Sequence, residues 1–140
     1  MASCIWVLPA HRKCLHACHA LAHLQGSFSR ARQIVIQVSA DSLHYGNKLV
    51  VEGKYNRRMF FPMIQVADGA GVVVDCGRDV TGYRPGDRVV THHATSWIDG
   101  RLAGASTWTG LESIIAGMLA EYVALNEEGA VAAPSYLSGK

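Results

Sequence analysis

The feature that most constrains the fold is a glycine-rich strand pattern followed at a short distance by a turn. Residues 66–76 contain clustered glycines and then three valines, which predicts a strand that closely approaches another piece of backbone. Pro85-Gly86-Asp87 predicts a turn, because proline presets φ and glycine accepts a positive φ. The turn leads into a second predicted strand at residues 88–91. These two runs indicate β structure in the middle of the chain.

Other short runs extend the β pattern on both sides. Residues 34–40, IVIQVSA, are rich in β-branched residues and predict a strand. A short helix is expected after it, capped by Asp41 or Ser42 and ended by Gly53. Short strands at close spacing with Gly and Pro turns favour a small barrel or sandwich. The further predicted segments are a strand at residues 5–8, a long loop at 92–116, a strand at 117–127 and a closing run at 130–134.

Length, charge and cysteine content exclude several classes of protein. A chain of 140 residues suffices for one domain, and a net charge of +2 is too small to predict a nucleic-acid partner. No apolar run approaches the roughly 18 residues of a membrane span, so no membrane partner is expected. The four cysteines fit reduced thiols in the cytoplasm. Residues 1–40 hold no Asp or Glu but include Arg12 and Lys13, so a mitochondrial transit segment is the alternative.

Three segments, taken in order, resemble the GroES-like catalytic domain of medium-chain dehydrogenases/reductases, and most of all its zinc-independent alcohol dehydrogenase and quinone oxidoreductase branch: SADSLHYGNKLVVEGKY, ADGAGVVVDCGRDVTGYRPGDRVV and GMLAEYVALNEEGAVAAPSYLS. The resemblance implies a mainly β fold, a partly open β barrel with a few short helices. It divides the chain into residues 1–32, a first strand plus a divergent Cys/His-rich segment, and residues 33–138, the GroES-like domain. No Rossmann domain is expected within these 140 residues.

The resemblance also implies a function. This domain would form the substrate side of an oxidoreductase that uses NAD(P)H and acts on a carbonyl, quinone or alcohol substrate. NAD(P)H is not expected to bind this chain alone, because no G-x-G-x-x-G motif opens a helix and a Rossmann domain would have to complete the site. The alternative is a non-catalytic GroES-like remnant or a protein-interaction domain. Self-association is expected through an apolar surface formed by Val131, Ala132, Ala133 and Leu137.

Zinc is not expected at the site that the resemblance implies. Zinc-dependent members carry a Cys after the second long strand and a Gly-His-Glu before the Gly-Ala-Gly strand. Here the corresponding places read SLHYGN and Val66-Ala67-Asp68. A catalytic zinc site needs three protein ligands of this kind, and the thiolate and the imidazole are both missing.

Three residues are candidates for the site. The zinc-independent relatives usually read S-L-N-Y-R-D where this chain has SLHYGN, so Tyr45 matches the Tyr near the nicotinamide and His44 replaces the Asn. His44 could donate a hydrogen bond or move a proton, or be an exposed loop histidine. Asp68 stands at the Glu position of the zinc branch, either as a polar cleft residue or as a turn residue that satisfies backbone N–H groups.

The most conspicuous local cluster, CLHACHALAH at residues 14–23, suggests a metal site. On a helix, His19 and His23 would form an i,i+4 pair. No carboxylate in the first 40 residues completes such a site, and the spacing matches no familiar zinc module. His92 and His93 would point to opposite faces of a strand and do not predict a shared metal. No metal site is therefore expected.

Overall fold

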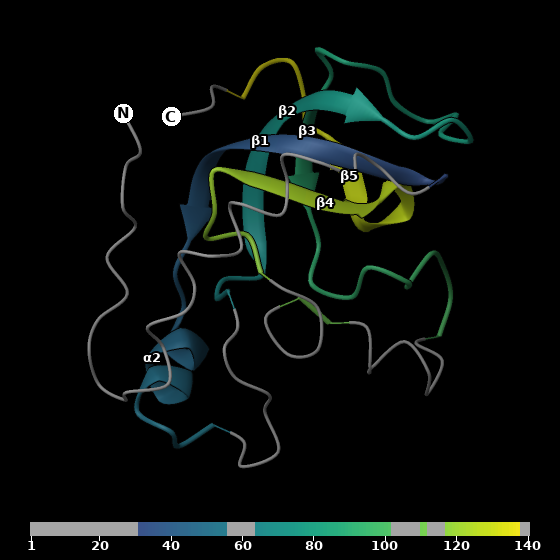
Figure 1. Cartoon of the computed structure of the whole chain (residues 1–140). Helices are drawn as coiled ribbons and strands as arrows, with labels where there is room; N and C mark the ends of the chain where they lie inside the picture. The colour runs from purple at the N-terminus through teal and green to yellow at the C-terminus, as the bar shows by residue number, and fades with distance from the viewer. Residues whose placement is uncertain (1–30, 56–63, 102–109, 112–116, 138–140) are drawn as a thin grey trace.

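A computed structural model describes residues 31–55, 64–101, 110–111 and 117–137 of the chain (Figure 1). These residues form one antiparallel five-stranded sheet with the strand order β4-β1-β2-β3-β5. The strands are β1 (Gln33–Ser42), β2 (Asp68–Cys76), β3 (Arg88–Thr91), β4 (Tyr122–Asn126) and β5 (Ala130–Ala132). One α-helix, α2 (Tyr45–Val51), follows β1, and a 3-10 turn, η3 (Glu127–Gly129), joins β4 to β5.

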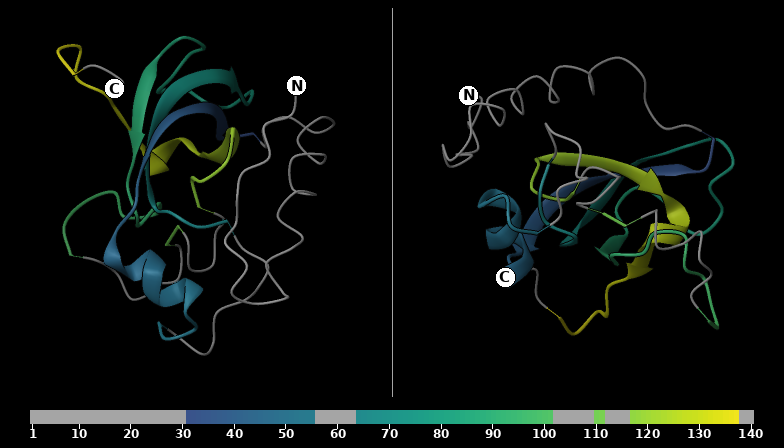
Figure 2. Two further views of the ribbon diagram at one scale, coloured as in Figure 1. Left: turned by 90° about the vertical axis from the view of Figure 1, so that its left-hand side faces the viewer. Right: turned by 90° about the horizontal axis from the view of Figure 1, so that it is seen from below.

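The sheet is strongly curved, with α2 beyond the far end of β1 (Figures 1 and 2). Strand β1 is central and pairs with both β2 and β4. Across the described ranges the sheet does not close on itself, since β4 and β5 are its two edges. This arrangement confirms the expected mainly β, partly open barrel of the GroES-like type.

Most of the core is formed by residues of the sheet strands. Ile34 and Ile36 of β1 are fully buried, as are Val73 of β2 and Met118. At Gly71, a Cβ atom would lie 2.2 Å from the carbonyl oxygen of Gln37, so only glycine lets β1 and β2 approach this closely. The predicted close backbone approach in the glycine-rich strand is confirmed.

Several predicted boundaries are wrong. The helix is not capped by Asp41 or Ser42, because both residues pair with β2 as the end of β1. The strand expected at residues 117–127 begins only at Tyr122. The N–H groups of residues 117–119 donate instead to the carbonyls of residues 64–66. Strand β2 begins at Asp68, two residues later than expected.

Some expectations concern parts of the chain outside the described residues, namely the strand at 5–8 and the Cys/His cluster at 14–23. Among the helices that are described, none is both long and apolar enough to cross a membrane.

Candidate functional site

His44 begins the helix α2 and uses its imidazole to do so. The Nδ1 atom accepts a hydrogen bond from the backbone N–H of Gly46 at 3.0 Å, and the backbone N–H of His44 donates to Oδ1 of Asn47 at 2.8 Å. This reciprocal pair is a capping box, in which histidine replaces the usual hydroxyl or carboxylate residue. His44 is solvent-exposed at the start of the helix.

Two tyrosines extend the exposed surface around this cap. The side chain of Tyr45 is 70% exposed and that of Tyr55 is 54% exposed. The rings of His44 and Tyr55 both approach Gly46, because a Cβ atom there would lie 2.6 Å from the His44 ring and 3.6 Å from the Tyr55 ring. Glycine at position 46 therefore leaves room for the His44 ring at the beginning of α2.

Asp68 lies at the same end of the sheet. It is the first residue of β2 and pairs with Ser42, the last residue of β1, two positions before His44. Its side chain is exposed. Close by, partial desolvation raises the pKa of the Asp41 carboxyl, although solvent still reaches that side chain. The structure thus places all three candidate residues, His44, Tyr45 and Asp68, at one end of the β1–β2 pair.

The segment that leads into Asp68 is a strained corner. Val66 has a φ of 74°, a conformation that is costly for a β-branched residue, and its side chain is fully buried. The carbonyl of Val66 accepts a hydrogen bond of 2.6 Å from the N–H of Met118. A Cβ atom on Gly117 would lie 2.3 Å from the Gln65 carbonyl oxygen, so the two segments touch through their backbones. The burial of the Val66 side chain and the backbone contacts with residues 117–118 hold this corner in place.

The corner has no imidazole at the position where the zinc branch carries one. Ala67, which stands where the zinc branch has its histidine, is 2% exposed and has no donor atom in its side chain. Within residues 31–55, 64–101, 110–111 and 117–137, no group of three or more His, Cys, Asp or Glu side chains is arranged to hold a metal.

The two histidines after β3, His92 and His93, have different surroundings. The strand ends at Thr91, so His92 and His93 follow it instead of lying within it. The Nε2 atom of His92 lies 2.9 Å from the carbonyl oxygen of Glu128, and its backbone N–H donates to Gly129. His93 is exposed. His92 therefore ties the start of the loop to η3, and the pair does not form one site.

The opposite end of the sheet carries a charged network that the sequence did not reveal. Glu127 is only 6% exposed and accepts hydrogen bonds from the backbone N–H groups of Gly82 (2.9 Å) and Thr81 (3.1 Å). It also forms an ion pair of 3.2 Å with Arg32. The Gly82 N–H is the largest influence that holds the Glu127 pKa below its usual value, with Thr81 and Arg32 adding to it against the opposing effect of burial.

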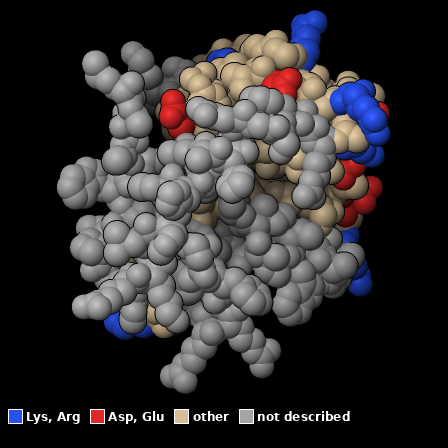
Figure 3. Space-filling model, viewed as in Figure 1, with Lys and Arg blue, Asp and Glu red and all other residues tan. Residues whose placement is uncertain are grey.

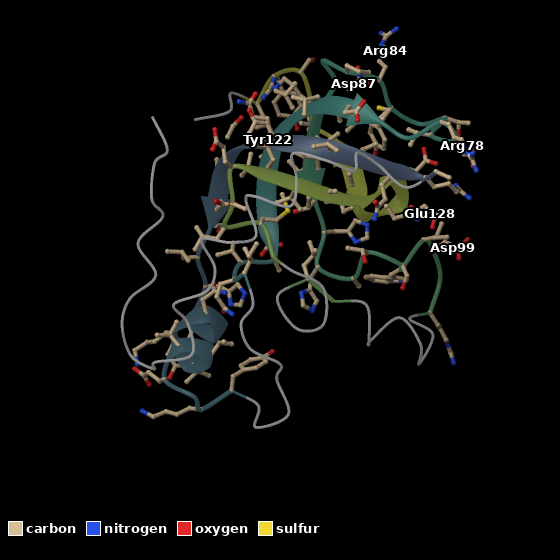
Figure 4. The ribbon with its side chains drawn as sticks, viewed as in Figure 1. Arg78, Arg84, Asp87, Asp99, Tyr122 and Glu128 are labelled. Carbon is tan, nitrogen blue, oxygen red and sulfur yellow. The ribbon has the colours of Figure 1, made fainter. Side chains whose placement is uncertain are left out.

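Figures 3 and 4 show the charged end of the sheet. Charged side chains of both signs line the right-hand border of the described surface, where Arg78, Asp99 and Glu128 are labelled, while α2 lies at the lower left (Figures 1, 3 and 4). At the charged end Arg32 forms ion pairs with both Glu127 and Glu128. The end that carries His44, Tyr45 and Asp68 is the better candidate for binding.

Comparison with known proteins agrees with the fold. Residues 30–135 match the model of the alcohol dehydrogenase GroES-like domain family. The chain is 30% identical to a zinc-type alcohol dehydrogenase-like protein of Schizosaccharomyces pombe. This match extends over 106 residues, which are 76% of this chain and 31% of that protein. A crystal structure named for an alcohol dehydrogenase of Sinorhizobium meliloti superimposes with a TM-score of 0.72 at 36% identity, covering 80% of this chain and 34% of that one.

A more distant structure, a quinone oxidoreductase of Pseudomonas syringae, shares the fold with a TM-score of 0.56 at 23% identity, covering 80% of this chain and 29% of that one. The fold and the matched residues define the class, a GroES-like β domain of the medium-chain dehydrogenase/reductase superfamily. The chain belongs to the alcohol dehydrogenase GroES-like domain family. It spans about a third of the length of the S. pombe and S. meliloti relatives described above.

Proposed function

We propose that this chain is the substrate-side domain of a zinc-independent, NAD(P)H-dependent oxidoreductase that acts on a small carbonyl, quinone or alcohol. The observation that carries the proposal is the position of His44, Tyr45 and Asp68 together at the exposed end of the β1–β2 pair. An imidazole, a phenol and a carboxylate that are all exposed at one end of a strand pair can orient a polar carbonyl or hydroxyl group. The family to which the chain belongs supports an oxidoreductase context.

Each residue has a defined part in this proposal. Tyr45, whose ring is largely exposed, would contact the nicotinamide side of the cofactor. The imidazole of His44, which accepts the Gly46 N–H at Nδ1, would bond or exchange a proton with the substrate oxygen. Asp68 would fix the orientation of the polar group from the β2 side. When bound, NAD(P)H supplies the hydride.

The cofactor is expected to need a second domain. The start of α2 does not offer a pyrophosphate site, because the helix has only seven residues and the His44 side chain already takes the Gly46 N–H. The residues described here fit one wall of a cofactor cleft and not the phosphate-binding part. The boundaries proposed for this wall are residues 33–138, with residues 1–32 as a separate divergent segment, and the proposed compartment is the cytoplasm.

Zinc independence is part of the proposal, although the S. pombe relative is named as zinc-type. Its support is the buried Ala67 side chain, which leaves the corner without an imidazole. The purified chain should contain well under one zinc per molecule by elemental analysis. Stoichiometric zinc that is lost in a His19→Ala/His23→Ala variant would instead establish a metal site in the N-terminal segment.

A second candidate function is binding of a protein partner without turnover. The observation that favours it is the exposed apolar surface at the β5 edge, where Val131 is 53% and Leu137 is 49% exposed. Such a surface fits a partner domain as well as it fits a catalytic complex.

The test combines the full chain with a Rossmann domain taken from an intact medium-chain dehydrogenase/reductase and with NADPH, and follows NADPH oxidation with aldehydes and quinones. Turnover is expected only with both components, and Tyr45→Phe and Asp68→Asn should each lower it by about tenfold or more. Tyr136→Phe is the matched control, because Tyr136 is also largely exposed but lies near the C-terminus. Binding of the two domains with no turnover would favour the partner-binding function. Micromolar binding of NADPH to the chain alone would contradict the proposal that a second domain is needed to bind the cofactor.

A further inference from the structure

Thr91, the last residue of β3, holds the corner that carries Asp68. Its side chain is 8% exposed. The Oγ1 atom accepts a hydrogen bond from the backbone N–H of Gly69 at 3.0 Å. The same hydroxyl donates to the carbonyl of Ala67 at 3.1 Å, with the carbonyl of Gly69 next nearest at 3.3 Å. The hydroxyl thus bonds the backbone on both sides of Asp68.

The register of the sheet explains why a side chain is needed there. Strand β3 pairs with β2 through Val90 and Ala70, and continuation of that register would bring Thr91 opposite Gly69. At Thr91 the backbone pairs with Ala130 of β5. The Thr91 hydroxyl satisfies the Gly69 N–H at the point where the described β2–β3 ladder ends.

The other side of the corner is held by the segment that starts at Gly117. The Met118 N–H donates a hydrogen bond to the Val66 carbonyl. The Met118 side chain packs against Gly69, because a Cβ atom added to Gly69 would lie only 2.8 Å from the Cβ of Met118. Met118 itself is fully buried. Asp68 therefore lies between two fixed backbone segments, with its own side chain directed to an exposed position.

We propose that Thr91 is a positioning residue, whose hydroxyl fixes the backbone of residues 67–69 and so holds Asp68 opposite Ser42 at the candidate site. The significance for catalysis rests on the proposed function. Substrate-orienting groups must keep their positions within a fraction of an ångström, and a group on the first residue of a strand does so only if its backbone is bonded.

The first experiment measures the hydroxyl bond itself in the full chain. Hydrogen exchange by NMR should show a protected Gly69 amide in the wild type. Thr91→Val should speed its exchange by about tenfold and shift the Asp68 resonances, whereas Thr91→Ser should restore both. Thr95→Val is the matched control, because Thr95 is also buried but its methyl group faces Gly129. That variant should leave the Gly69 amide unchanged.

Two results would overturn the proposal. One is a Gly69 amide that exchanges freely in the wild type, which needs no folded variant to establish. The other is an equal effect of Thr91→Val and Thr95→Val on the Gly69 and Asp68 signals, which would indicate general loosening of the core.

The second experiment uses the two-domain assay with NADPH. Thr91→Val is expected to lower turnover by about tenfold with little change in the KM for NADPH, and Thr91→Ser is expected to recover it. Normal turnover in Thr91→Val would contradict a positioning role in catalysis. Absence of turnover in the wild type would refute the proposed function, while the exchange measurements would still decide whether Thr91 holds Asp68.

Discussion

His44 combines a structural task with a candidate chemical one, and substitution can separate them. His44→Ala removes the acceptor for the Gly46 N–H and should lower the free energy of unfolding by about 1 kcal/mol, measured by urea denaturation. His44→Asn should restore that stability, because asparagine is among the preferred helix caps. If His44 also contacts substrate, His44→Ser will remain deficient in the two-domain assay, because serine is another preferred cap but lacks the ring and the amide that the relatives' asparagine has. Failure of asparagine to restore stability would show that the cap contributes little.

Glu127 should make stability depend on pH. Its folded-state pKa lies below the usual 4.5, so its contribution is fully present above that value and is lost as the pH falls through the folded-state pKa. Glu127→Gln should cost about 1–3 kcal/mol at neutral pH, and the difference from wild type should shrink in acid. Denaturation curves at several pH values are the measurement. Glu128→Gln is the control, since Glu128 also contacts Arg32 but is 35% exposed. An undiminished difference in acid would contradict the charge-based explanation.

For individual residues, the sequence predicted which residues belong to the candidate site better than it predicted their hydrogen-bond and ion-pair partners. His44, Tyr45 and Asp68 could be proposed from the resemblance, and the structure brings them to one end of the sheet. The cap itself could not be predicted, because Asp41 and Ser42 are the more usual capping residues and only their pairing with β2 removes them. Glu127 gave no signal, since its partner Arg32 lies 95 residues away in the chain.

Among the elements, the pairing of β1 with β2 depends on the absence of a side chain at Gly71. Gly71→Ala would drive a Cβ atom into the Gln37 carbonyl oxygen of β1, so the strands would have to separate. We expect a loss of roughly 1–3 kcal/mol or failure to fold, measured by thermal and urea unfolding. Val74→Ala on the same strand is the control and should change stability by only about 0.5 kcal/mol, because Val74 is exposed. A tolerated Gly71→Ala would show that the sheet can relax there.

Element types were predictable where the local pattern and the tertiary environment agree. The strands at 34–40 and 88–91 and the turn at Pro85-Gly86-Asp87 appear where the sequence places them. The segment at 117–121 shows the limit, because Gly117 and its neighbours bond residues 64–66 and this contact cannot be read from local alternation. The fold was therefore more predictable than the corner that shapes the candidate site.

For the whole molecule, the two sheet edges and the apolar surface beside β5 lead us to expect self-association. Val131, Ala132 and Leu137 are exposed as expected, whereas Ala133 is half-buried. Light scattering should show oligomers or aggregates, and Val131→Lys should reduce them, because charge on an edge strand opposes pairing. Val74→Lys is the control on the inner strand β2.

The same association should be reversed by a Rossmann domain that covers the apolar surface. A monodisperse monomer with reversible unfolding near 45–65 °C, roughly the range of small domains, would contradict this expectation. The domain would then be stable by itself, and the non-catalytic alternative would gain support.

The central place of β1 has a consequence during synthesis of the chain. Its neighbour β4 begins about 80 residues after β1 ends, so a ribosome moving at about 5–20 residues per second completes β4 roughly 4–16 s after β1. Throughout that interval β1 can pair on the β2 side only. The nascent chain thus presents an open strand edge for seconds, and its yield in a cell should depend on chaperone capacity as much as on final stability.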